Sequence, residues 1–385
     1  MAKRKAEVEV KPVKKPSKTQ NEVQYTLCVP SSVISAVNAK NLQQITQIAH
    51  QIARAATIYN VGEIVVLDIP TAQKKEEEAE KSVKVVLGST DKGGKKIKFN
   101  FDDEDIVQKK APETVVEEES KDDNEEEING SKSTSTTNEN NTMLLATLLQ
   151  YFITPPYLVK SVFANNEYNT KFKYAQHMPK LSTLPFMSNN EVWRDFREGL
   201  TIPKHTPKIT SKKNKKISPK NKLSTTKYVN IGEAEPMVLE KDVPVNVRVT
   251  VDLKNKVIVS PLQAYGTIGN KSSFGYFVRV AKTFSTLFTE SSVPEGYSSS
   301  IYVKSDDYFQ KSDSNLVDYD KEKIHVKGGN VLLVLGNWFD IEYSFSREGL
   351  EGVDSVSQMF DGELKIPSGV KIEDAALISL AKVYS

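Results

Sequence analysis

Short apolar runs alternate with a longer amphipathic stretch in the N-terminal part of the chain. Residues 25–29 form a β-rich run, and residues 64–67 are apolar at every position, which is typical of a strand covered on both faces. Between them, in 41–59, apolar side chains recur every three or four residues and would line one face of a helix. The order strand, helix, strand predicts an α/β fold built on an open, mostly parallel sheet.

The same alternation returns in the C-terminal third of the chain. The expected strands are 276–280, 300–303 and 331–335, and the expected helices are 143–152, 281–288 and 371–383. The run Val331-Leu332-Leu333-Val334-Leu335 has no polar position. We therefore expect it in the interior of the sheet, where helices cover both faces.

A different period separates these two parts. Short β-branched segments, some of them alternating between apolar and polar residues, occupy 228–232, 237–239, 246–252 and 256–260. Such segments are typical of antiparallel strands with one buried face. They predict a small antiparallel β-module, resembling a barrel, inserted into the α/β chain.

Two tracts lack the apolar residues that a core requires. Residues 1–22 are basic, and 71–141 are rich in Lys, Glu, Ser, Thr and Asn, with nine acids against one lysine in 113–127. Burial in such sequences does not offset the entropy lost on ordering. We therefore predict a disordered basic tail and a largely disordered acidic insertion.

A third tract, 204–227, is basic and contains no acidic residue. Its central lysines are Lys212, Lys213, Lys215, Lys216, Lys220 and Lys222. These lysines are candidates for contacts to RNA phosphates, which would make binding strongly dependent on salt. The alternative is a flexible, solvated loop.

Several classes of chemistry have no support in the sequence. The single cysteine, Cys28, excludes a disulfide within the chain, and the four histidines are scattered without a partner at metal-ligand spacing, so we expect no metal site. No run of eighteen apolar residues is present, so we expect no membrane span. The N-terminal Lys3-Arg4-Lys5 is either a nuclear address, an RNA-contacting arm or part of a solvated tail.

Two transitions near the C-terminus are candidates for a ligand site. One is the strand 331–335 running into a predicted loop of Gly336 and residues 337–342, and the other is the Pro/Gly loop 364–369 before the last helix. Ligands of open α/β sheets bind outside the carboxyl ends of the strands, and a glycine there lets backbone groups approach the ligand. An ordinary tight turn would use the same residues, so the pattern alone leaves both interpretations open.

The order of these elements resembles the SPOUT superfamily of S-adenosylmethionine-dependent RNA methyltransferases, in particular an archaeal–eukaryotic branch with an inserted, OB-like β-barrel. The resemblance rests on segments spread over most of the ordered chain. They are Gln51–Ala56 (QIARAA), Val61–Val66 (VGEIVV), Phe196–Gly199 (FREG), Gly275–Ala281 (GYFVRVA), Val331–Gly336 and Glu373–Ala381 (EDAALISLA).

The resemblance implies a trefoil knot, in which the C-terminal segment threads a loop, with S-adenosyl-L-methionine bound in the knot. By position, the cofactor contacts would be Lys304, Ser305, Leu335, Gly336, Asn337, Ile366, Pro367, Ser368, Gly369 and Ile372. Arg54 would be a contact to RNA or beside the cofactor, again by family position. Relatives often have a second glycine where this chain has Asn337, and Arg and Thr where it has Val370-Lys371-Ile372.

The same resemblance implies how the chain divides and acts. The expected parts are a tail at 1–22, a SPOUT domain at 23–200 and 266–385, and the inserted OB-like module at 201–265. We expect a dimer, of two identical chains or with a related SPOUT protein, that methylates rRNA or another structured RNA during ribosome biogenesis, in the nucleus and there in the nucleolus. The alternative is an inactive SPOUT-fold scaffold that only binds RNA. The sequence identifies no catalytic base.

Overall fold

The computed structural model describes most of the chain. The described residues are 23–70, 137–164, 166–187, 195–203, 224–265, 275–293, 295–306, 316–320, 324, 328–350 and 352–384. They belong to one compact unit, Met1–Pro70 with Thr137–Ser385, whereas the second unit, Thr71–Thr136, lies outside the described residues. The predicted tail, residues 71–136 of the acidic insertion and the six central lysines of 204–227 therefore lie outside them, whereas residues 137–141 of that insertion are helical.

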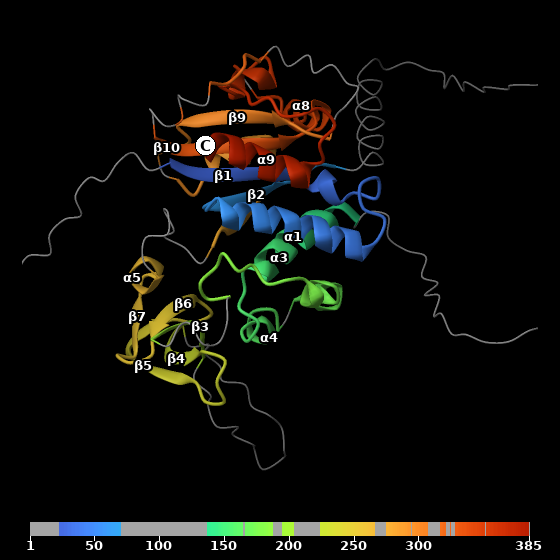
Figure 1. Cartoon of the computed structure of the whole chain (residues 1–385). Helices are drawn as coiled ribbons and strands as arrows, with labels where there is room; N and C mark the ends of the chain where they lie inside the picture. The colour runs from blue at the N-terminus through green and yellow to red at the C-terminus, as the bar shows by residue number, and fades with distance from the viewer. Residues whose placement is uncertain are drawn as a thin grey trace, which may run out of the picture. The chain divides into compact units, whose positions relative to one another are not determined.

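A six-stranded sheet, parallel throughout, forms the main part of the fold (Figure 1). In spatial order its strands are β11 (Gly362–Glu363), β9 (Ser299–Lys304), β10 (Gly329–Gly336), β1 (Val23–Pro30), β2 (Glu63–Leu67) and β8 (Phe277–Ala281). The predicted parallel α/β sheet is confirmed. The apolar run 331–335 lies at its centre, between β9 and β1.

Helices cover both faces of this sheet. The helices α1 (Leu42–Ile58), α3 (Thr137–Phe152) and α9 (Ile372–Tyr384) pack against one face, and α6 (Phe284–Thr289) and α8 (Trp338–Ser346) against the other. Consecutive residues of β10 face opposite ways, so Val331, Leu333 and Leu335 join the first core, while Leu332 and Val334 join the second. This double burial explains why the strand has no polar position.

Helix α1 begins where the sequence predicts, and its apolar face packs against the sheet. The side chain of Asn41 accepts a hydrogen bond from the backbone N–H of Gln44 and caps the helix. Ile48, Ile52 and Ala56, at spacings of four, are buried in the core. The helix is thereby fixed to the sheet along its length.

The inserted β-module is a separate five-stranded antiparallel sheet that is nearly closed, like a barrel. Its spatial order is β5 (Met237–Pro244), β4 (Thr225–Asn230), β3 (Phe196–Ile202), β6 (Arg248–Asp252) and β7 (Val257–Val259). The edge strands β5 and β7 approach each other. Its small core consists of Val229, Ile231, Leu239, Val249 and Val251.

Among the elements not expected from the sequence, three bear on the module or on the carboxyl edge of the sheet. Strand β3 begins at Phe196, ahead of the expected start of the module at residue 201. Residues 338–346 form helix α8, so the predicted loop after β10 is wrong beyond Asn337. Strand β11, of two residues, was not predicted at all.

Strand β11 lies between β9 and the connection that leads from β9 to β10. It pairs with β9 on one side. On the other side the backbone N–H of Glu363 donates to the carbonyl of Val317 at 2.9 Å, and the N–H of Tyr319 donates to the carbonyl of Glu363 at 2.8 Å. Val317 and Tyr319 belong to the connection between β9 and β10, so β11 lies between β9 and the chain that leaves β9.

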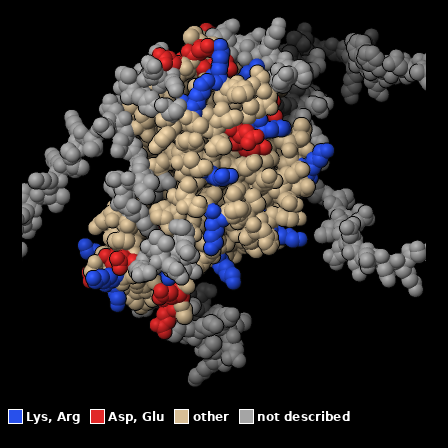
Figure 2. Space-filling model, viewed as in Figure 1, with Lys and Arg blue, Asp and Glu red and all other residues tan. Residues whose placement is uncertain are grey.

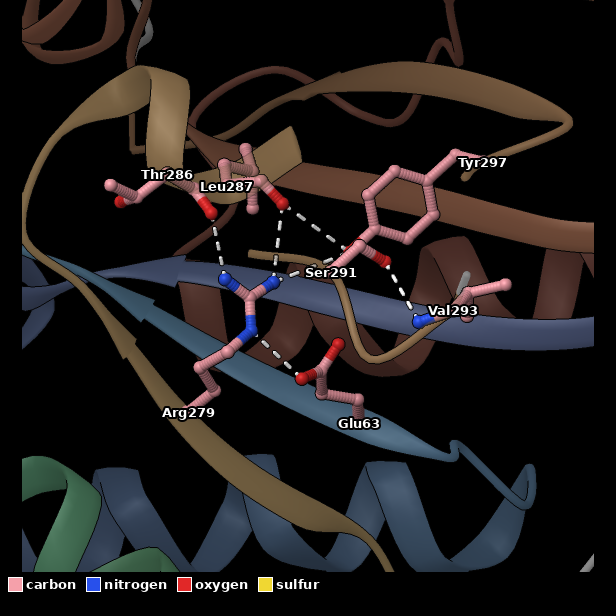
Figure 3. A network of polar contacts seen from close by, with 7 residues as sticks. All are labelled: Glu63, Arg279, Thr286, Leu287, Ser291, Val293 and Tyr297. Atoms are coloured by element: carbon pink, nitrogen blue, oxygen red, sulfur yellow. Dashed lines mark hydrogen bonds and ion pairs between the residues drawn. The ribbon is translucent and has the colours of Figure 1, made fainter. Parts of the chain in front are cut away.

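A buried ion pair joins β2 to the edge strand β8 (Figure 3). The Arg279 Nε donates to Glu63 Oε1 at 2.9 Å, and the guanidinium also donates to the backbone carbonyls of Thr286 and Leu287 in α6 at 2.8 and 3.1 Å. The Glu63 side chain is 3% exposed and that of Arg279 is 16% exposed. The charge of Arg279 is thus neutralised inside the fold, and the pair fixes α6 to the sheet edge.

Removing one charge from this pair leaves the other buried and uncompensated, so we expect Glu63→Gln to lower the free energy of unfolding by about 3 kcal/mol. The matched control is Glu233→Gln, because Glu233 pairs with Arg197 at 3.5 Å with its side chain 57% exposed. The control should cost less than about 1 kcal/mol. Urea unfolding followed by circular dichroism measures both, and equal losses would contradict a structural role for the buried pair.

Candidate functional site

The carboxyl ends of β9 and β10 lie side by side in the sheet. Gly336 is paired in register with Lys304, and Leu335 with Val303. The loops that follow the two strands therefore leave the same edge, where α/β sheets bind ligands.

Backbone hydrogen bonds tie three loops together at this edge. The N–H of Ser305 donates to the carbonyl of Gly336 at 3.0 Å, and the hydroxyl of Tyr302 donates to the same carbonyl at 3.0 Å. The N–H of Asp306 donates to the carbonyl of Val370 at 2.7 Å. The ends of β9 and β10 and the loop before α9 are thus held as one unit.

A lysine adds a fourth segment to this unit. The Nζ of Lys371 lies 3.1 Å from Asp306 Oδ1 and donates to Asn38 Oδ1 at 3.1 Å. The amide nitrogen of Asn38 in turn donates to the carbonyl of Ser32 at 3.0 Å. The segment between β1 and α1 is thereby attached to the loops after β9 and β11.

Two backbone positions at this edge require glycine or a residue that tolerates a left-handed conformation. Gly336 has φ +145°, and a Cβ there would lie 3.3 Å from Pro30 Cγ and 3.6 Å from Ile341 Cδ1. Gly369 has φ +74°. A side chain at Gly336 would be strained and would also press on Pro30.

Unused polar groups remain at the same edge. The hydroxyl of Ser305 is buried and has no hydrogen-bond partner among the described residues, although buried polar groups are almost always paired. The backbone N–H groups of Ile366, Ser368 and Gly369 also have no acceptor within the described part of the chain, and these residues are exposed or half-buried. The arrangement therefore offers one buried hydroxyl and a turn with open amides to a ligand.

The ten residues predicted for the cofactor site lie at the ends of β9 and β10, in the loop between β11 and α9, and at the start of α9, and they do not play equal parts. The side chains of Leu335 and Ile372 are buried in the main core, so only their backbone could meet a ligand. The side chain of Asn337 accepts a hydrogen bond from the N–H of Asp340 and caps α8. Lys304 is half-exposed at the end of β9, and Pro367 is exposed.

One carboxyl group of the site has a shifted pKa. Glu373, in the first turn of α9, is half-buried, and burial raises the pKa of its carboxyl. The neighbouring charges of Asp374 and Asp306 raise the pKa further, whereas Lys371 opposes the shift. A signal for Glu373 was present in the sequence, since acids are favoured in the first turn of a helix, but its burial was not predictable.

The candidate RNA contacts are only partly within the described residues. Arg54 lies exposed on α1, and its guanidinium is not among the groups that tie the loops together. The six predicted lysines between 212 and 222 lie outside the described residues. The described end of the same basic tract includes Lys227, in β4. Within the described ranges, no group of three or more His, Cys, Asp or Glu could hold a metal ion. No helix of the described chain is both long and apolar enough to cross a membrane.

Comparison with known proteins places these features in a family. A family model described as "Putative RNA methyltransferase" matches residues 24–383. Two proteins of Saccharomyces cerevisiae, each described as a "Putative methyltransferase", are 30% identical to this chain over 377 residues. The alignment covers 96% of this chain and 96% of the first protein, and 94% of this chain and 87% of the second. The chain therefore belongs to the family of RNA methyltransferases that this model describes.

Proposed function

We propose that this protein transfers a methyl group from S-adenosyl-L-methionine to RNA, with the donor bound at the edge formed by the loops after β9, β10 and β11. The observation that carries the proposal is the hydroxyl of Ser305, which is buried without a partner among the described residues and lies next to the closely packed Gly336. A hydroxyl in this state costs free energy unless a ligand satisfies it. Membership in the methyltransferase family supports a methyl donor as that ligand.

The residues present fit such a donor. The open amides of Ile366, Ser368 and Gly369 suit the acceptor atoms of a purine ring, and the Ser305 hydroxyl suits either a donor or an acceptor on the ligand. Lys371 supplies a positive charge near the same loops. When bound, the cofactor supplies an electrophilic methyl group on a sulfonium sulfur.

Positioning accounts for most of the catalysis that this site could provide. The loops are held by backbone hydrogen bonds and by Lys371, so a bound pair of reactants would meet in a fixed geometry. If the target atom must lose a proton, Glu373 is the candidate acceptor. Its raised pKa makes its carboxylate a stronger base than an exposed one.

A trefoil knot of the SPOUT type is part of the proposal. The position of β11 supports it, because β11 lies between β9 and the segment around Asp318, which belongs to the connection from β9 to β10. The chain after β11 then returns to the loops at Asp306 and continues into α9. A C-terminal segment that passes through the β9–β10 connection would take this path.

The wider setting is also proposed. RNA as the substrate follows from the family description, and the basic tail and lysine-rich loop of the sequence support it. We propose rRNA or another structured RNA of ribosome biogenesis as the target, a nuclear and nucleolar location, and a dimer with an identical or related chain.

The direct test is incubation of the full chain with S-adenosylmethionine labelled in its methyl group and with total RNA that lacks the modification. We expect label in RNA, and a loss of that label when Ser305 or Gly336 is altered. RNA binding without any label in RNA and without cofactor binding would contradict the enzyme. That outcome would favour a scaffold that only binds RNA.

Gly336→Ala should weaken the binding of S-adenosylhomocysteine by about tenfold or more, because the new Cβ strains the backbone and presses on Pro30 at the site. The matched control is Gly349→Ala, since Gly349 has φ +57° and a Cβ there would meet no atom within 4 Å. Gly349→Ala should lose about 1 kcal/mol of stability from backbone strain alone, and Gly336→Ala should lose more because its Cβ also presses on Pro30. Isothermal titration calorimetry measures affinity, and equal affinity in the two variants would refute the placement of the site.

Ser305→Ala should lower the affinity for S-adenosylhomocysteine without lowering the stability of the protein. The hydroxyl has no partner among the described residues, so we expect unchanged or slightly higher stability and an affinity for S-adenosylhomocysteine reduced roughly fivefold, the worth of one hydrogen bond. Ser379→Ala is the control with the opposite pattern, because the buried Ser379 hydroxyl donates to the carbonyl of Ala376 at 3.3 Å. Thermal unfolding and calorimetry read out the two effects, and unaltered affinity in Ser305→Ala would count against the proposed ligand contact.

A further inference from the structure

Besides the lysine-rich loop, most of which lies outside the described residues, the chain has a second segment with many basic residues and almost no acidic ones. Residues 153–187 contain four lysines and a single acid, Glu167. Helix α1 contains one charged residue, Arg54. We call the surface formed by Arg54, Lys160, Lys171, Lys173 and Lys180 the α1 basic face; all five residues are exposed.

Packing brings these residues, distant in sequence, to one region. The ring nitrogen Nε2 of His50 lies 2.9 Å from the carbonyl of Pro179, and the His50 ring packs edge-on against Phe152 at 5.1 Å between centroids. His50 is one helical turn before Arg54 on α1. The contact therefore places Lys180, next to Pro179, close to the part of α1 that carries Arg54.

A cluster of aromatic rings supports the rest of the face. The rings of Tyr151, Phe163 and Phe172 pack against one another in tilted or edge-on arrangements, with centroid distances of 4.7 to 5.9 Å. They belong to the same core as α1 and the sheet. Lys160, Lys171 and Lys173 flank these rings in sequence, so a packed core, and not a free loop, carries them.

The charges of the face are available to a ligand. Among the described residues, none of its four lysines forms an ion pair. The Nζ of Lys173 lies 5.7 Å from the centre of the Tyr174 ring. The space-filling view shows Lys and Arg side chains over α1 and α4 (Val159–Val162) with no acidic side chain visible between them (Figure 2).

An ordinary solvated surface would mix the two signs of charge. The surface of the barrel is mixed in this way, because the exposed residues Glu240, Lys241 and Asp242 follow one another on β5. A face of one sign attracts a polyanion and raises its local concentration. Scattered exposed cations and acids do not have this effect.

We propose that the α1 basic face binds phosphates of the substrate RNA on the flank of the target nucleotide. Asn38, just before α1, contacts Lys371 at the donor site, and Arg54 lies twelve residues after the first residue of α1, Leu42. At 1.5 Å per residue this is about 18 Å, or about five steps of a stacked strand at 3.4 Å each. RNA held on this face would therefore reach the donor site without involving the lysine-rich loop.

This inference rests on the proposed function for its choice of RNA, and its test is independent of methyl transfer. The face variant combines Lys160→Gln, Lys173→Gln and Lys180→Gln in the full chain. The control variant combines Lys241→Gln, Lys256→Gln and Lys282→Gln, three exposed lysines elsewhere, and so removes the same net charge. The probe is a fluorescein-labelled, single-stranded 20-nucleotide RNA of mixed sequence, followed by anisotropy from about 50 to 200 mM salt, a range over which phosphate contacts change affinity strongly.

We expect the face variant to bind this RNA about tenfold or more weakly at low salt, with the slope of log K against log salt reduced by about 2, the value for three lost contacts to a single strand. The control variant should keep the slope and affinity of the unaltered protein. Equal losses in both variants, or an unchanged face variant, would overturn the proposal. Binding of a poly-glutamate peptide that the RNA fails to displace would assign the face to an acidic protein instead and would also overturn it.

Calorimetry with S-adenosylhomocysteine separates this inference from the proposed function. The face variant should bind the cofactor product as tightly as the unaltered protein does, because none of its three lysines contacts the loops of the donor site. If neither protein binds it, the proposed function fails. The RNA measurement still decides whether the face binds phosphate.

Discussion

Two backbone hydrogen bonds hold together the edge on which the functional account depends. The N–H of Ser305 donates to the carbonyl of Gly336, and the N–H of Asp306 donates to the carbonyl of Val370. Both bonds are made by main-chain groups, so they depend on the chain path and not on particular side chains. Because they join the loops after β9, β10 and β11, they fix where a ligand could lie and leave the Ser305 hydroxyl buried without a partner in the described chain. The same path sets β11 against the β9–β10 connection, which is why the proposed knot and the proposed site depend on one another.

The main sheet and its long helices were predictable because burial imposes a period on the sequence. Strand β10 is covered on both faces and is therefore apolar at every core position. Helix α1 is covered on one face and shows the corresponding stripe. The antiparallel module was recognisable by its alternating, β-branched segments. The ends of β9 and β10 could be predicted as a site because ligands bind at the carboxyl ends of parallel strands, although the pattern did not exclude a plain turn.

The rest depends on contacts between residues far apart in the chain. Strand β11 has two residues, too few for any period, and only its pairing with β9 defines it. Helix α8 follows directly on Asn337, whose side chain caps it, whereas the sequence indicated a loop. The burial of the Ser305 hydroxyl and the meeting of α1 with the segment around Pro179 are likewise products of tertiary packing. No local pattern encodes them.

The most direct measurement of the central claim is an experimental structure of the full chain with S-adenosylhomocysteine bound. The account predicts the ligand at the edge formed by the loops after β9, β10 and β11, with an atom at hydrogen-bond distance from Ser305 Oγ and its ring against the turn of residues 366–369. A ligand bound on the antiparallel barrel, or a Ser305 hydroxyl that stays buried and unpaired with the ligand bound elsewhere, would contradict it.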